Sequence, residues 1–159
     1  IQLSNMQHCR LFDCRVNNYY WLMLAWKANE HIDFDFADCQ LAEEIDSEDE
    51  DYIKSKCRKR INMAATFAIL IGEDIRSKHK YVRWEMEVAL EKGCRIIGIN
   101  LDGSRQMVQD TCPPIIRDIG AIFVPYSPHI VAYALENYEM QDKGNWFYKD
   151  KVYQQLGYE

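Results

Sequence analysis

The carboxylate of Glu85 is placed in the sequence where it could take part in a reaction. It lies in a helix predicted over residues 78–92, and at about 100° per residue it falls on the flank of the apolar stripe of that helix. The stripe consists of Val82, Met86, Ala89 and Leu90. A carboxylate held near a cleft can accept hydrogen bonds and stabilise positive charge. The alternative is a surface ion pair with Arg83 or Lys80, although Glu87 lies nearer to Arg83.

Two aromatic side chains flank this carboxylate. Tyr81, a candidate substrate contact, lies one turn before Glu85, and Trp84 falls roughly opposite the apolar stripe. We therefore expect Trp84 to be exposed, either near a substrate or in an interface with a second copy or a partner. The alternative is that the tail, residues 146–156, folds over Trp84 within one chain.

The elements that must position Glu85 alternate between short apolar segments and amphipathic helices. The continuous apolar runs 66–72 and 94–101 are typical of strands buried on both faces. Five strands are predicted in all, at residues 9–13, 32–37, 66–72, 94–101 and 121–124. Helices are predicted at residues 17–29, 47–63, 78–92, with a stop at Gly93, and 128–138. This alternation predicts an α/β fold with a five-stranded parallel sheet and helices on both faces.

Length and charge limit the class of protein. The 159 residues predict a single domain, 1–159, on which a polar and aromatic tail, 140–159, packs through Val152, Tyr153 and Leu156. The net charge of −6 argues against a nucleic-acid partner, and no apolar run is long enough for a membrane span. The six cysteines lack Cys-x-x-Cys spacing, so we expect reduced thiols, no metal site and a cytoplasmic location.

A ligand of such a sheet is expected beyond the carboxyl ends of the strands. Candidate substrate contacts there are Phe12, Asp13, Asp38 and Glu73. Each has a structural alternative: Phe12 in the core, Asp13 as a cap, Asp38 in a turn, and Glu73 capping the following segment. Glycine-rich dinucleotide, P-loop and G-x-S-x-G motifs are missing from the sequence, which argues against those nucleotide-binding and hydrolase classes.

The order of several segments resembles the bacterial TIR-like family, and within it the TIR subunits of Thoeris anti-phage systems. T-F-A-I-L-I-G-E (66–73), Y-V-R-W-E-M-E (81–87) and R-I-I-G-I-N-L-D-G (95–103) carry the central part of the resemblance. A-W-K-A-N and I-D-F-D-F-A-D precede them, and C-P-P-I-I, A-I-F-V-P-Y, Y-A-L-E-N-Y and Y-K-D-K-V-Y-Q-Q-L-G follow. The resemblance covers residues 12–157.

This resemblance implies a flavodoxin-like TIR fold and an enzyme that cleaves the nicotinamide–ribose bond of NAD. The catalytic Glu of the family stands in an aromatic-V-x-x-E pattern, which places that role on Glu85. The first loop departs from the family pattern, because Phe12-Asp13 is followed by the unusual Cys14-Arg15-Val16-Asn17-Asn18. NAD is then a substrate, and no cofactor is expected.

The implied partners are NAD, further copies of the chain, and a separate effector protein reached through a nucleotide product. The product is ADP-ribose, a cyclic isomer or a conjugate, depending on the acceptor. Two other functions stay open: a non-catalytic TIR-like module that self-associates, and an enzyme resembling nucleoside deoxyribosyltransferases. Neither nucleic acid nor a membrane is expected as a partner.

Overall fold

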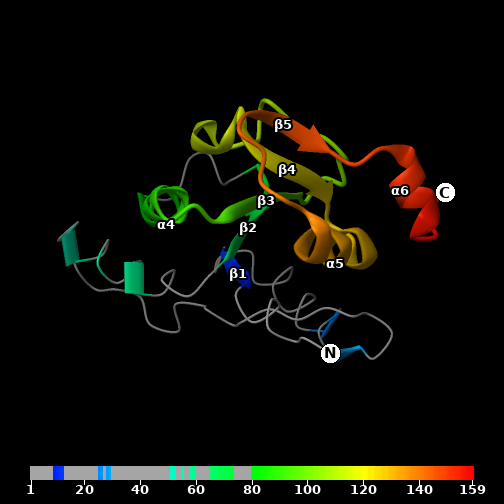
Figure 1. The fold of residues 1–159 in the computed structure, drawn as a ribbon, viewed down its shortest axis with the longest axis horizontal. Coiled ribbons are helices and arrows are strands. Elements are labelled where there is room, and N and C mark those ends of the chain that lie inside the picture. The colour runs from blue at the N-terminus through cyan, green and yellow to red at the C-terminus, as the bar shows by residue number, and fades with distance from the viewer. Residues whose placement is uncertain are drawn as a thin grey trace.

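A computed structural model describes residues 9–12, 25–26, 28–29, 51–52, 55, 58–59, 65–73 and 80–159. These residues contain one sheet with the strand order β1-β2-β3-β4-β5, in which all neighbours are parallel (Figure 1). The strands are β1 (Cys9–Phe12), β2 (Thr66–Ile71), β3 (Arg95–Asn100), β4 (Ile119–Pro125) and β5 (Gly144–Phe147). The parallel α/β architecture predicted from the alternation of elements is confirmed in this part of the chain.

Four of the five predicted strands are present, as β1 to β4, and the predicted strand at residues 32–37 lies outside the described residues. The four are neighbours in the order that a flavodoxin-like sheet, 2-1-3-4-5, requires of its first, third, fourth and fifth strands. The additional strand β5 was not predicted. Its four residues, GNWF, show neither an apolar run nor a clear alternation.

The helices are α4 (Lys80–Glu91), α5 (Pro128–Asn137) and α6 (Asp150–Gln155), with a single 3₁₀ turn, η1 (Pro114–Ile116). The helix predicted at 78–92 is confirmed, and Gly93 ends it with φ +68°, a conformation that glycine adopts readily. The described residues within 51–59 are helical, and so are residues 25, 26 and 28. The predicted helices 47–63 and 17–29 otherwise lie outside the description.

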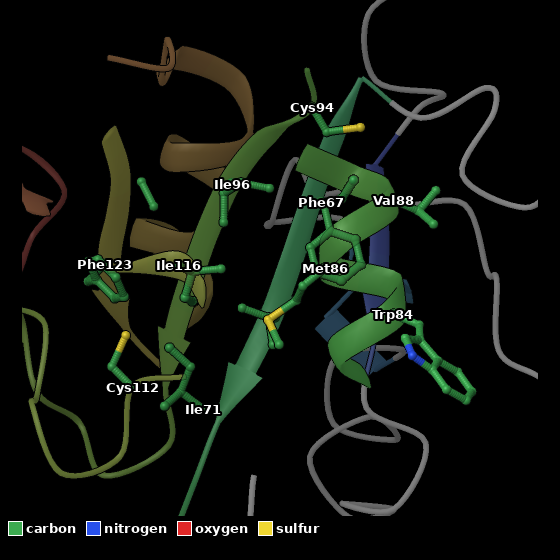
Figure 2. Packing of buried hydrophobic residues seen from close by; sticks show 13 residues of the cluster. Phe67, Ile71, Trp84, Met86, Val88, Cys94, Ile96, Cys112, Ile116 and Phe123 are labelled. Atoms are coloured by element: carbon green, nitrogen blue, oxygen red, sulfur yellow. The ribbon is translucent and has the colours of Figure 1, made fainter. Parts of the chain in front are cut away.

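Side chains from alternate strand positions form two cores, one on each face of the sheet. Phe67, Ile71 and Phe123 pack with Met86 and other residues of α4 on one face (Figure 2). The opposite face packs against α5 and α6, with these residues: Leu70, Ile97, Ile99, Val124, Ile130, Val131, Ala134 and Tyr153. Burial of both faces explains why β2 and β3 are continuously apolar, and it confirms helices on both sides (Figure 1).

Among the residues that the structure describes, none of the helices has the length and apolarity needed to cross a bilayer.

Candidate functional site

Glu85 is buried more deeply than its helical position predicted. It is 3% exposed, between Trp84 and Met86, which are 8% and 4% exposed. Among the described residues the buried polar side chains are Thr66, Glu85 and Asn100, and Glu85 is the ionisable one of the three. Since a carboxylate is rarely buried unless other groups stabilise it, this position is a candidate for function.

The other acidic residues of α4 have surface roles. Arg83 donates from Nε to Oε1 of Glu87 at 3.1 Å, an i,i+4 pair on the helix exterior. Arg58 lies 3.6 Å from Glu91, and both side chains are exposed. The expectation that Glu87 lies on the side of Arg83 is confirmed, so Glu85 and Glu87 are chemically alike but occupy different environments.

The prediction that Trp84 is exposed is wrong. Trp84 belongs to the buried cluster that also contains Phe67 and Met86, and Figure 2 shows it on α4 near the end of the helix opposite Cys94. Residues 84, 85, 86, 88 and 89 are all buried, so α4 is covered over most of its circumference. A helical wheel shows where apolar residues repeat but not how many sides of the helix are covered.

The alternative cover for Trp84, the tail 146–156, is also wrong. In this segment β5 pairs with β4, and the side chains of α6 join the core on the α5 face. Trp84 lies in the core on the other face. An interface centred on Trp84 therefore has no basis in the structure.

The remaining predicted contacts are described only in part. Phe12 ends β1 next to β2, in register with Ile69, so it lies near the carboxyl edge of the sheet, but its side chain is outside the description. Glu73 is an exposed turn residue soon after β2. Tyr81 is in the first turn of α4, and its side chain is not described either. Asp13 and Asp38 lie outside the described residues.

Asn100, at the carboxyl end of β3, is a candidate that sequence reasoning missed. Its side-chain amide donates to the carbonyl oxygens of Ser104 and Gln106, at 2.8 and 2.9 Å. The backbone carbonyl oxygen of Asn100 accepts from the backbone N–H groups of Gly103 and Tyr126. Asn100 thus ties together the loops that follow β3 and β4. The available signal was an amide side chain directly after the apolar residues 96–99 of β3.

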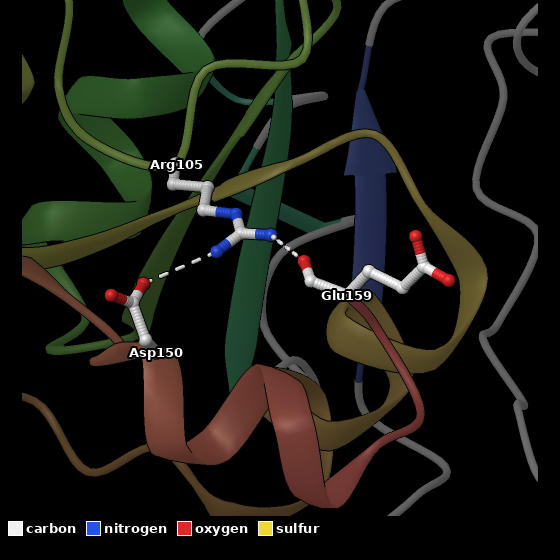
Figure 3. A network of polar contacts seen from close by, with 3 residues as sticks. All are labelled: Arg105, Asp150 and Glu159. Atoms are coloured by element: carbon white, nitrogen blue, oxygen red, sulfur yellow. Dashed lines mark hydrogen bonds and ion pairs between the residues drawn. The ribbon is translucent and has the colours of Figure 1, made fainter.

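The chain beyond β5 lies across the same edge. Arg105, in the loop after β3, donates to Oδ1 of Asp150 at 3.2 Å and to the backbone oxygen of Glu159 at 3.4 Å (Figure 3). Its guanidinium also lies 4.0 Å from the centre of the Tyr153 ring, a cation–π geometry. Tyr153 is 1% exposed, so α6 is anchored both by burial and by Arg105.

Tyr158 makes a second anchor at the first turn of α5. Its hydroxyl accepts from the backbone N–H of Ile130 at 3.1 Å and lies 2.6 Å from the hydroxyl of Ser127. Since the first N–H groups of a helix lack partners within the helix, the phenol satisfies a donor that the chain would otherwise leave to water. The ends of β3 and β4 are therefore closed by the chain's own last residues.

We expect Tyr158→Phe to lower the free energy of unfolding by about 1 kcal/mol, because it removes an acceptor from the helix start. Urea denaturation measures the change. Ser127→Ala removes the other partner of the hydrogen bond between the two hydroxyls. The double variant should therefore lose less unfolding free energy than the sum of the two single variants. Additive effects would show that the two hydroxyls do not interact.

Burial also sets the acidity of several groups near this edge. Burial raises the pKa of the Cys112 thiol to about 11, although Arg117 opposes the effect. Burial likewise raises the pKa of Tyr153 to about 12, against the lowering effect of Arg105. Cys94 and Cys112 are both buried and take part in no disulfide, in agreement with the expected reduced thiols. The Cys112 thiol therefore lacks the lowered pKa of a reactive cysteine.

The parallel α/β sheet and its helices define a fold compatible with TIR-like proteins. The family model of the Thoeris protein ThsB, TIR-like domain, matches residues 12–106, more than half of the 159 residues. The chain therefore belongs to this family, and membership points to a role in anti-phage defence. The match includes α4 with Glu85 and ends in the loop that follows β3. None of the curated proteins matches the chain.

Proposed function

We propose that this protein cleaves the nicotinamide–ribose bond of NAD and releases a nucleotide signal that activates a separate effector in anti-phage defence. The observation that carries the proposal is the burial of Glu85 on the helix that follows β2, in a chain of the ThsB TIR-like family. An ionisable group that is this deeply buried is difficult to explain by stability alone.

Cleavage of the nicotinamide–ribose bond requires one carboxylate and no second acidic residue. The nicotinamide of NAD is already cationic, so it leaves as a neutral base, and its departure needs no proton, unlike that of an ordinary glycoside. Positive charge develops on the ribose as the bond breaks. A preorganised carboxylate beside the ribose stabilises that charge more in the transition state than in the ground state.

The buried setting of Glu85 supports this role. An ionic interaction is stronger where water is excluded than at the surface, because the local dielectric is lower. Glu87, which is only partly buried and is already paired with Arg83, has neither advantage. The acceptor then decides the product: water yields ADP-ribose, an atom of the bound nucleotide yields a cyclic isomer, and a separate small molecule yields a conjugate.

The direct test is incubation of the purified chain with NAD, with and without a lysate of phage-infected cells, followed by mass analysis of the nucleotides. We expect free nicotinamide and an ADP-ribose derivative in equal amounts. The lysate arm detects activity that depends on an infection signal. Unchanged NAD in both arms, together with concentration-dependent association of the chain, would instead favour a non-catalytic module. Turnover of nucleosides but not NAD would favour a deoxyribosyltransferase-like enzyme.

A further inference from the structure

We propose that Asn100 is a positioning residue of the NAD site: its amide fixes the loop at residues 101–106 as a wall of that site. This inference rests on the proposed function. It adds to that function a residue, Asn100, that affects substrate binding by holding a loop in place. It is carried by the buried hydrogen bonds of Asn100 and by its place at the carboxyl edge of the sheet.

The side chain of Asn100 holds the loop from the inside. It is 1% exposed, and its Nδ2 donates to the carbonyl oxygens of Ser104 and Gln106. Both donor hydrogens of the amide are therefore used on one short loop. Hydrogen bonds made in a buried setting are electrostatically stronger than those at the surface, and leaving the two carbonyls without a donor would be costly.

The loop is also held from the outside. The Ser104 N–H donates to Oδ1 of Asp102 at 2.9 Å, and Gly103 takes φ +82° to form the turn. Arg105 then extends to Asp150 and Glu159 (Figure 3). The loop is thus fixed between the interior amide of Asn100 and the C-terminal residues, which favours a rigid wall over a mobile lid.

The strand register places Asn100 on the α4 face of the sheet. Asn100 pairs with Ile71, and Ile71 packs in the core beneath α4. Ile96, on the same side of β3, lies in that core too, whereas Ile97 and Ile99 lie in the other. Asn100 and the helix that carries Glu85 therefore share one face, and Asn100 stands at the edge where parallel sheets bind ligands.

The oxygen of the same amide is an additional sign of a site. Oδ1 of Asn100 is buried, and among the described residues no hydrogen-bond donor reaches it. A buried acceptor without a donor is unfavourable, so a purely structural role does not account for the whole side chain.

The test compares three variants of the full chain. Asn100→Ala removes the amide, and Asn100→Asp keeps its volume but removes both donor hydrogens. Asn145→Ala is the matched control, because Asn145 also fixes a loop through its amide, donating to Asp118 at 2.9 Å, but at the amino end of β4. Hydrogen exchange of residues 101–106 is measured without NAD, and KM and kcat are measured with NAD.

For both Asn100 variants we expect at least 10-fold faster exchange in the loop and a KM for NAD raised about 10-fold, with kcat changed less than 3-fold. Asn145→Ala should alter neither. Unchanged exchange would overturn the anchoring role, and faster exchange with an unchanged KM would show that the loop is not part of the site. If Asn100→Ala does not fold, Asn100→Asp decides between these results. A wild-type chain inactive on NAD would overturn the proposed function. Because hydrogen exchange is measured without NAD, it still shows in that case whether Asn100 anchors the loop.

Discussion

Replacing Glu85 with glutamine is expected to reduce NAD cleavage by a factor of about 100 to 1000. The substitution keeps the volume of a side chain that is 3% exposed but removes the charge that stabilises the ribosyl cation. Loss of one preorganised electrostatic group typically has an effect of about this size. Single-turnover assays of nicotinamide release, with the enzyme in saturating excess over NAD, measure the chemical step directly. The melting temperature, recorded in parallel, should show that the fold persists.

The matched control is Glu87→Gln, which makes the same chemical change two residues away. Glu87 is paired with the exposed Arg83, so its replacement should leave cleavage within a few-fold of wild type. The change in unfolding free energy should stay within about 0.5 kcal/mol, as is usual for exposed helical ion pairs. Equal losses in the two folded variants would mean that the carboxylate of Glu85 has no special role.

Replacing Gly120 with alanine is expected to lower the free energy of unfolding by about 3 kcal/mol or more. Gly120 has φ +88°, and an added Cβ would lie 1.8 Å from the backbone oxygen of Gln141. A rigid backbone atom cannot move aside as a side chain can, so the segment leading into β5 must shift. Strain at the glycine and the steric overlap both contribute. The hydroxyl of Tyr138 also donates to the Gly120 carbonyl, and this bond would be disturbed. Chemical denaturation monitored by circular dichroism measures the loss.

Gly93→Ala separates the two contributions. Gly93 also has a positive φ, +68°, but apart from its chain neighbours no described residue has an atom within 4 Å of the position of an added Cβ. Its replacement should therefore cost only the conformational strain, about 1–2 kcal/mol. If Gly120→Ala is no more destabilising than Gly93→Ala, the close approach of Gln141 does not constrain the fold.

The sequence by itself determined the central framework. Apolar runs long enough for buried strands predicted β2 and β3, and a helical repeat closed by glycine predicted α4 to within two residues at each end. These signals are readable because burial on both faces of a parallel sheet leaves few polar positions in a strand. The order of the motifs was enough to identify the family, and the helical position of Glu85 drew attention to the carboxylate that the structure shows to be buried.

Only the tertiary structure decided which surfaces are covered. Trp84 was expected in solvent, yet it is 8% exposed, because periodicity along one helix carries no information about how many neighbours surround it. The strand β5 was missed for a related reason: its four residues form a strand by pairing with β4, and GNWF alone has no strand pattern.

The polar framework of the candidate site depends on contacts that are distant in sequence. Arg105 reaches Asp150, 45 residues away, and Tyr158 reaches Ser127 across 31 residues. No local pattern encodes such pairs, since they exist only when the loops after β3 and β4 meet the last helix. Asn100 is a residue of the same kind: it closes an apolar strand, and its importance follows from the two carbonyls that the folded loop brings within reach of its amide.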